Sequence, residues 1–97
     1  MGWSVLAYCN ENNPFSKNNY NQKNIEVRNV DLQDIEKLQK HLSKSNFSNI
    51  SSFINCAGKI FPHRYSDSSY ESIIESLKVN SISASLFIQK LLPLMIK

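Results

Sequence analysis

The stretch Ser52-Phe53-Ile54-Asn55-Cys56-Ala57-Gly58 decides the fold that the sequence predicts. It starts with apolar residues, as a buried strand does, and it ends in small ones. A buried parallel strand that ends in small residues lets a ligand approach the main chain at the carboxyl edge of a sheet. Asn80 follows 22 residues after Gly58, inside a long amphipathic segment. The stretch therefore predicts an α/β fold with a ligand site at this edge.

The bulk composition bounds the class of protein. With 97 residues, 41% of them hydrophobic, the chain has material for one small globular unit. Its net charge of +3 comes from scattered Lys and Arg residues without a basic run, which does not favour nucleic-acid binding. Polar residues and Pro93 interrupt the apolar carboxyl-terminal segment, so no membrane span is predicted.

The two cysteines and the amino-terminal residues indicate a compartment. The residues after Met1 show no basic region followed by a long apolar run, as a secretory signal would. Cys9 and Cys56 both fall in predicted strands, and we interpret them as small core residues rather than as a disulfide or a metal pair. We therefore expect a reduced, cytoplasmic protein without a metal site.

Three short segments have strand patterns. Val5–Cys9 is an apolar run bounded by polar residues, residues 25–30 alternate apolar and polar side chains, and residues 50–55 lead into the Asn-Cys-Ala-Gly stretch. The Asn-rich residues 10–24 predict a surface loop, and residues 59–67, which contain a proline, predict another.

Two segments have the apolar spacing of a helix. The first places Ile35, Leu38 and Leu42 on one face, with acidic residues near its amino end and basic residues near its carboxyl end. The second covers residues 68–91 and is predicted to be capped by Asp67 or Ser68 and ended or kinked by Pro93. Its predicted apolar stripe consists of Tyr70, Ile73, Ile74, Leu77, Ala84, Ile88 and Leu91. The order of elements favours a parallel α/β sheet.

Four motifs, which occur in order along the chain, resemble the short-chain dehydrogenase/reductase (SDR) family. They are Gly2-Trp3-Ser4-Val5, Val30-Asp31-Leu32, Asn55-Cys56-Ala57-Gly58 and Val79-Asn80, and the helix end Phe87-Ile88-Gln89-Lys90-Leu91-Leu92-Pro93-Leu94-Met95 also matches. The resemblance covers nearly the whole chain except the Asn-rich loop. It implies that residues 1–97 form a partial NAD(P)-binding Rossmann-type domain with three strands and two helices, whose first and later strands are missing. An unrelated small α/β domain would require all four matches to coincide by chance.

The resemblance assigns roles in cofactor binding to six residues. Asp31 would accept a hydrogen bond from the adenine amino group and the Leu32 N–H would donate to the ring, although Asp31 could instead cap the following helix. The main chain from Asn55 to Gly58 would pass under the adenosine ribose, with Ala57 and Gly58 small so that the nucleotide fits. Cys56 stands where the family usually has Asn. Because the family contacts the cofactor here mostly through the main chain, this change is expected to weaken the side-chain contacts that support the segment more than cofactor binding.

The resemblance assigns the one catalytic role to Asn80. An Asn among apolar neighbours in a helix is unfavourable unless its polar groups find partners. The family places this residue where the helix is locally opened and a water bridges its main chain to the catalytic lysine. The alternative interpretation is an Asn that faces solvent.

The chain also departs from the family pattern. Its only glycines are Gly2 and Gly58, so it lacks the Gly-rich loop that holds the pyrophosphate. No tyrosine is followed by a lysine four positions later, so the Tyr-x-x-x-Lys pair, expected beyond Lys97 with the catalytic Ser, is not matched. Whether the chain is an enzyme is therefore open, and alone we expect it to be inactive.

The resemblance implies NADP or NAD as cofactor and a small carbonyl or alcohol substrate. The end of the first predicted strand, Tyr8-Cys9-Asn10, has no carboxylate to repel a 2′-phosphate, which favours NADP. The alternative function is a non-catalytic remnant that binds a nucleotide or forms a homo-oligomer through the helix at residues 68–91. Ile82, Leu86 and Phe87, off the main stripe, would suit such a helix contact.

Overall fold

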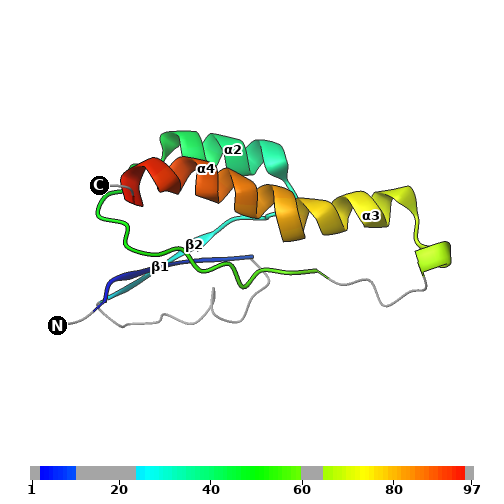
Figure 1. The fold of residues 1–97 in the computed structure, drawn as a ribbon, viewed down its shortest axis with the longest axis horizontal. Helices are drawn as coiled ribbons and strands as arrows, with labels where there is room; N and C mark the ends of the chain where they lie inside the picture. Colours follow the sequence, from blue (N-terminus) through cyan, green and yellow to red (C-terminus); the bar gives the residue numbers. More distant parts are fainter. Residues whose placement is uncertain (1–2, 11–23, 60–64, 96–97) are drawn as a thin grey trace. The chain divides into compact units, whose positions relative to one another are not determined.

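The structure is a computed structural model of the chain, and it describes residues 3–10, 24–59 and 65–95. Most of the predicted Asn-rich loop, and residues 60–64 of the second predicted loop, lie outside the described residues. The chain forms two compact units, Met1–Asp31 and Leu32–Lys97 (Figure 1). The first contains the strands and the second contains the helices.

The first unit is a parallel pair of strands. β1 (Val5–Cys9) and β2 (Ile25–Asn29) pair in register along their whole lengths. The Val30 N–H continues the ladder by donating to the carbonyl oxygen of Cys9 at 2.9 Å. Both predicted strands are confirmed, the second one residue shorter than predicted.

Polar side chains link β1 and β2. The Arg28 guanidinium donates from Nη1 to the Tyr8 hydroxyl of β1 at 3.3 Å and, within β2, from Nε to Oε1 of Glu26 at 3.1 Å. The hydrogen bond to Tyr8, and to a smaller extent the one to Glu26, raises the pKa of Arg28 above its ordinary value. The Cys9 thiol donates to Oδ1 of Asn29 at 3.2 Å. The two contacts between the strands, Arg28–Tyr8 and Cys9–Asn29, add stability to the sheet. A sheet of only two strands is marginally stable without such contacts.

Residues 50–59 follow an extended path but form no strand, so the prediction of a third strand over residues 50–55 is wrong. In the part of the chain that the structure describes, the sheet has two strands. Apolar residues favour the extended conformation, whereas a strand also requires a hydrogen-bonded neighbour. Ile54 is 79% exposed and Cys56 is exposed as well. The segment is therefore not a buried strand, and Cys56 is not a core residue.

The first predicted helix is confirmed as α2 (Ile35–Lys44). Its N-cap is Asp34, whose Oδ1 accepts a hydrogen bond from the Lys37 N–H at 3.1 Å. The alternative that Asp31 caps this helix is therefore wrong. At the other end, the Ser45 hydroxyl donates to the His41 carbonyl oxygen at 2.7 Å, which satisfies one of the last free carbonyls of the helix.

The second predicted helix consists of three consecutive pieces. They are α3 (Tyr70–Leu77), the π-helix η2 (Lys78–Ile82) and α4 (Ser83–Met95). A short 3₁₀ turn, η1 (Tyr65–Asp67), precedes them.

The ends of this helix differ from the prediction. Ser69 caps α3, accepting a hydrogen bond from the Ser72 N–H at 3.1 Å, so neither Asp67 nor Ser68 is the N-cap. Pro93 does not end the helix, because α4 continues to Met95. A proline this close to the helix end removes a single hydrogen bond, which the remaining turns tolerate.

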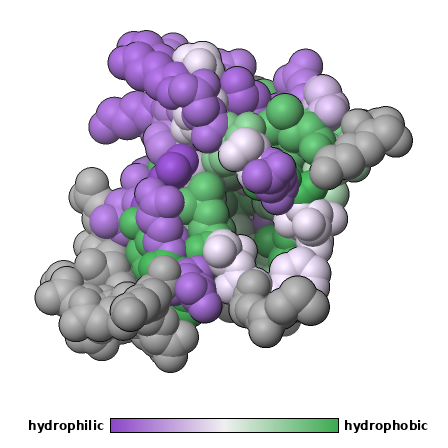
Figure 2. All heavy atoms as spheres, turned by 90° about the vertical axis from the view of Figure 1, so that its left-hand side faces the viewer, coloured by the Kyte–Doolittle hydropathy of each residue, from purple (hydrophilic) through white to green (hydrophobic). Residues whose placement is uncertain are grey.

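The core of the second unit lies where α2 packs on α4 (Figure 1). Leu38 and Leu42 of α2 are buried, as are Val79, Phe87 and Leu91 of the second helix. Polar side chains cover the outer surface of α2, at the top of Figure 2.

The buried face of the second helix differs from the predicted stripe. Of that stripe, Leu91 is buried, whereas Tyr70, Leu77 and Ile88 are 73%, 48% and 47% exposed. Phe87 is buried instead and stacks on Phe53 of the extended segment, with ring centroids 5.6 Å apart. The buried positions Val79, Ser83, Phe87 and Leu91 are spaced four residues apart, so the buried face runs along a different line of the helix from the predicted stripe.

Candidate functional site

The helix that carries Asn80 opens at this residue. In η2 the Ser83 N–H donates to the carbonyl oxygen of Lys78, five residues earlier, and not to that of Val79, as a regular α-helix would. The Ser83 hydroxyl takes over the Val79 carbonyl oxygen, at 2.8 Å, and Ser83 is only 1% exposed. A buried hydroxyl thus replaces the hydrogen bond that the opening removes. The expected local opening is confirmed; the catalytic role of Asn80 stays a prediction.

The Asn80 side chain joins the helix to the residue after Gly58. Its Oδ1 accepts a hydrogen bond from the Lys59 N–H at 2.8 Å, and its Nδ2 donates to the Lys59 carbonyl oxygen at 2.9 Å. The other Nδ2 proton is donated to Oγ of Ser76 at 3.0 Å. The carboxamide therefore pairs with Lys59 as the peptide group of a neighbouring strand would. Asn80 is exposed, as the alternative interpretation of an Asn facing solvent expects. Its side-chain oxygen and nitrogen nevertheless bond to protein groups.

Gly58 is small for a reason that the sequence did not reveal. A Cβ atom at this position would lie 3.3 Å from Oδ1 of Asn80, which is closer than most side chains accept. The backbone of Gly58 has no positive φ, so the glycine is favoured here by the limited space beside Asn80 and not by its conformation. A larger residue would push against the same amide that holds Lys59.

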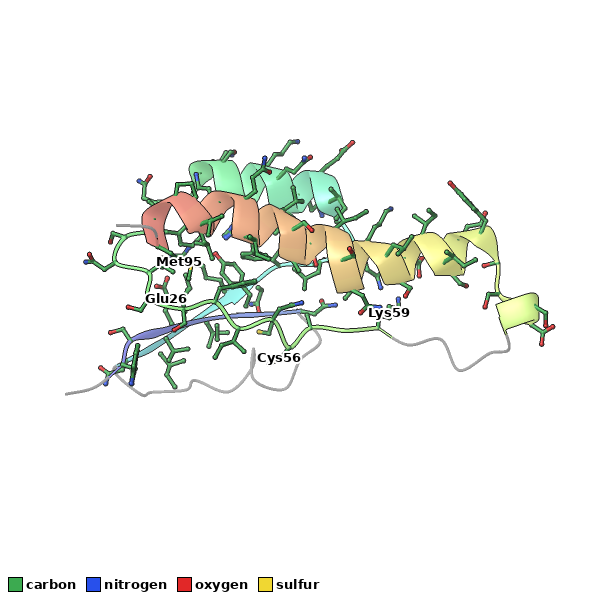
Figure 3. All side chains as sticks on the ribbon, viewed as in Figure 1. Glu26, Cys56, Lys59 and Met95 are labelled. Atoms are coloured by element: carbon green, nitrogen blue, oxygen red, sulfur yellow. The ribbon has the colours of Figure 1, made fainter. Side chains whose placement is uncertain are left out.

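The Lys59 side chain contacts the helix as well. Its Nζ lies 3.3 Å from Oε2 of Glu75, and the two side chains are 34% and 44% exposed. Figure 3 shows Cys56 and Lys59 on the extended segment that runs beside the helix. Sequence reasoning missed Lys59 and Glu75, together with Ser76 and Ser83. The usable signals were a serine four residues before Asn80, on the same side of the helix, and a lysine directly after the Asn-Cys-Ala-Gly motif.

The other predicted site residues are less closely connected. Asn55, Cys56 and Ala57 are exposed along the extended segment. Leu32 is half-buried in the turn before α2. Asp31 is exposed at the end of the first unit, so the predicted adenine-binding pair crosses the boundary between the two units.

The expected cofactor makes different demands on the exposed segment and on the helix ends. The small, exposed Ala57 and Gly58 leave the extended main chain open to a nucleoside. The amino ends of α2 and α3, in contrast, are capped by Asp34 and Ser69 and carry Glu36 and Glu71 in their first turns. Because those N–H groups are partly used and the nearby charge is negative, neither helix end suits a pyrophosphate. In the described residues, therefore, the amino ends of α2 and α3 do not suit the pyrophosphate of a dinucleotide.

Comparisons with known proteins do not test the family resemblance, which stays a prediction. No protein-family model, no curated protein and no solved structure matches the chain. Within the described ranges, no three His, Cys, Asp or Glu side chains are arranged to hold a metal ion, and no helix is long and apolar enough to cross a membrane. A functional interpretation therefore rests on the motifs and on the geometry around Asn80.

Proposed function

We propose that the chain is part of an SDR-type fold in which residues 55–58 lie under the adenosine of NADP or NAD. The complete fold would transfer hydride between NAD(P)H and a carbonyl or alcohol substrate, with Asn80 at the position of the family's catalytic asparagine. The observation that carries the proposal is the π-turn at Asn80 and its pairing with Lys59, directly after Gly58. π-Helices are rare; they are mostly single turns inside α-helices and are frequent at functional sites.

The contacts of Asn80 limit what this residue could do in the reaction. Its carboxamide is occupied by Lys59 and Ser76, so a role in proton transfer would fall to its main-chain carbonyl. When bound, NAD(P) supplies the hydride, and the protein must supply a proton donor. The sequence contains no Tyr-x-x-x-Lys pair, so this polypeptide alone is proposed to be inactive. NADP is the favoured cofactor, because no carboxylate stands at residues 8–10.

Nucleotide titrations test the binding part of the proposal. NADP, NAD and adenosine are each added to the isotopically labelled 97-residue chain, and amide chemical shifts are followed by NMR. We expect shifts at residues 31–32 and 55–58, larger with NADP than with NAD. Ala57→Leu, which blocks the open main chain, should weaken them, whereas Ser52→Leu, an equally exposed small residue of the same segment, should not. Shifts that are absent, or that survive Ala57→Leu, would contradict the proposal.

A second assay tests the statement about activity. NADPH oxidation by the purified chain is followed with a panel of aldehydes and ketones, and no rate above the protein-free reaction is expected. A measurable rate, abolished by heat denaturation of the chain, would show that the proton donor lies elsewhere in this polypeptide.

The alternative function, a non-catalytic remnant that forms oligomers through its helix, is favoured by a different observation. Large apolar side chains of this helix are exposed, namely Tyr70, Leu77, Ile82, Ile88 and Leu92. Phe87, which the sequence suggested for such a contact, is buried inside the unit and does not contribute. Sedimentation equilibrium distinguishes the two functions. A dimer that Ile88→Ser with Leu92→Ser dissociates, without any nucleotide-induced shift, would favour the remnant.

A further inference from the structure

Four side chains meet at residue 59 and define what we name the residue-59 latch: Lys59, Glu75, Ser76 and Asn80. Two of its contacts involve side chains that the family motifs do not include. Ser76 accepts a hydrogen bond from Nδ2 of Asn80 at 3.0 Å, and Glu75 lies 3.3 Å from the Lys59 ammonium. Both residues belong to the last turn of α3, immediately before the π-turn.

The two contacts act on different groups. The Lys59–Glu75 ion pair restrains the Lys59 side chain; it is more than one-third exposed on both sides, and exposed pairs of this kind contribute little to stability. The hydrogen bond from Asn80 to Ser76 is exposed as well, but it restrains a carboxamide already held at two other points. Of the two contacts, only the one to Ser76 acts directly on the Asn80 carboxamide.

Geometry gives Ser76 a defined effect on Asn80. Lys59 offers one donor and one acceptor, which engage Oδ1 and one Nδ2 proton. The remaining Nδ2 proton points along the helix to Ser76, four residues earlier, so the carboxamide is held from the helix side and from the segment side. Without Ser76 the amide would be held by its two bonds to Lys59 alone, and it would leave Lys59 more often.

We propose that Ser76 is a positioning residue that acts through Asn80: it holds the carboxamide against Lys59 and thereby fixes the main chain of Gly58 and Lys59. The effect on the conformation of Gly58 and Lys59 is inferred from the contacts of the residue-59 latch alone. Its consequence for nucleotide binding rests on the proposed function, because adenosine would lie on the same main chain.

Amide hydrogen exchange in the full chain tests the conformational effect. Ser76→Ala should speed exchange of the Lys59 amide about fivefold relative to the unsubstituted chain, as expected from the loss of one ordinary hydrogen bond. Ser76→Thr, which keeps the hydroxyl, should restore slow exchange. Ser85→Ala is the matched control, because that exposed hydroxyl also bonds within the helix, to the Ser81 carbonyl oxygen, but lies outside the latch.

Three outcomes would overturn the inference. They are an unchanged Lys59 amide in Ser76→Ala, equal acceleration of all amides in the second unit, and failure of Ser76→Thr to restore the rate. If the Ser76→Ala variant does not fold, exchange rates measured in the unsubstituted chain test the inference instead. The Asn80 carboxamide protons should exchange more slowly than those of the exposed Asn46, and equal rates would also overturn the inference.

Nucleotide titration of the same variants separates this inference from the proposed function. If Ser76→Ala speeds Lys59 exchange and also weakens the NADP-induced shifts at residues 55–58, both stand. If exchange responds while the unsubstituted chain shows no NADP-induced shift, the latch stands and the proposed function fails. If NADP binds equally well to a Ser76→Ala chain with an open latch, the link between the two fails.

Discussion

The carboxamide of Asn80 and the peptide group of Lys59 exchange two hydrogen bonds, from Lys59 N to Oδ1 at 2.8 Å and from Nδ2 to the Lys59 carbonyl oxygen at 2.9 Å. This is the hydrogen-bond pattern of two paired strand residues, made here by one side chain. It occurs at the carboxyl end of residues 50–59, none of which belongs to a strand. The Asn80 side chain thus gives the Lys59 peptide group the partners that a paired strand would give it.

Asn80→Ala tests how much this pairing contributes to the free energy of unfolding. Alanine has the higher helix propensity, by about 0.5 kcal/mol, so the substitution would stabilise the chain if the three hydrogen bonds contributed nothing. We expect instead a loss of about 1–2 kcal/mol in the free energy of unfolding. Urea denaturation followed by far-UV circular dichroism measures it, since every described helix belongs to the second unit. An increase in stability would contradict the assigned contacts.

Ser83→Ala tests how the π-turn is maintained. The substitution leaves the Val79 carbonyl oxygen without its bond from the Ser83 hydroxyl in a buried position, and we expect a loss of about 1–3 kcal/mol. Ser85→Ala removes a similar bond from an exposed site and should change stability by less than about 0.5 kcal/mol. Equal effects of the two substitutions in urea denaturation would show that the buried hydroxyl has no special role.

Gly58→Ala tests the close approach to Asn80. At a position without positive φ, Gly→Ala alone should stabilise the chain by about 0.4–1 kcal/mol, because the unfolded chain loses freedom. In this chain the new Cβ meets Oδ1 of Asn80 at 3.3 Å, so we expect that gain to vanish or reverse. In an Asn80→Ala background the gain should reappear. A double-mutant cycle in thermal unfolding measures this coupling, and strictly additive effects would refute it.

Phe87→Ala and Ile88→Ala compare two adjacent apolar residues of α4. Phe87 is 6% exposed and stacks on Phe53, whereas Ile88 is 47% exposed. Removing the buried ring should cost about 3–5 kcal/mol, enough to unfold a unit of this size, while Ile88→Ala should cost less than about 1 kcal/mol. Loss of helical circular dichroism in the first variant alone is the expected result. A larger loss of stability in Ile88→Ala than in Phe87→Ala would instead support the apolar stripe predicted from the sequence, which includes Ile88.

Local sequence signals predicted several elements correctly. The apolar run Val5–Cys9 forms the predicted strand to the residue, and α2 has the expected apolar face. These elements depend on residues close in sequence, which is why periodicity reveals them. The caps were less predictable, because several neighbouring polar residues could each accept the first N–H groups of a helix. Asp34 and Ser69 are the N-caps, and Asp31, Asp67 and Ser68 are not.

The sequence by itself determined which segments are extended or helical, and it marked Asn80 as a residue that needs hydrogen-bond partners. Only the tertiary structure decided that residues 50–55 form no strand, that Phe87 rather than Ile88 is buried, and that the Asn80 carboxamide pairs with Lys59. The physical reason is range. Backbone propensity acts between neighbouring residues, whereas ladder pairing, burial and the Asn80 bonds to Lys59 join residues far apart in the chain.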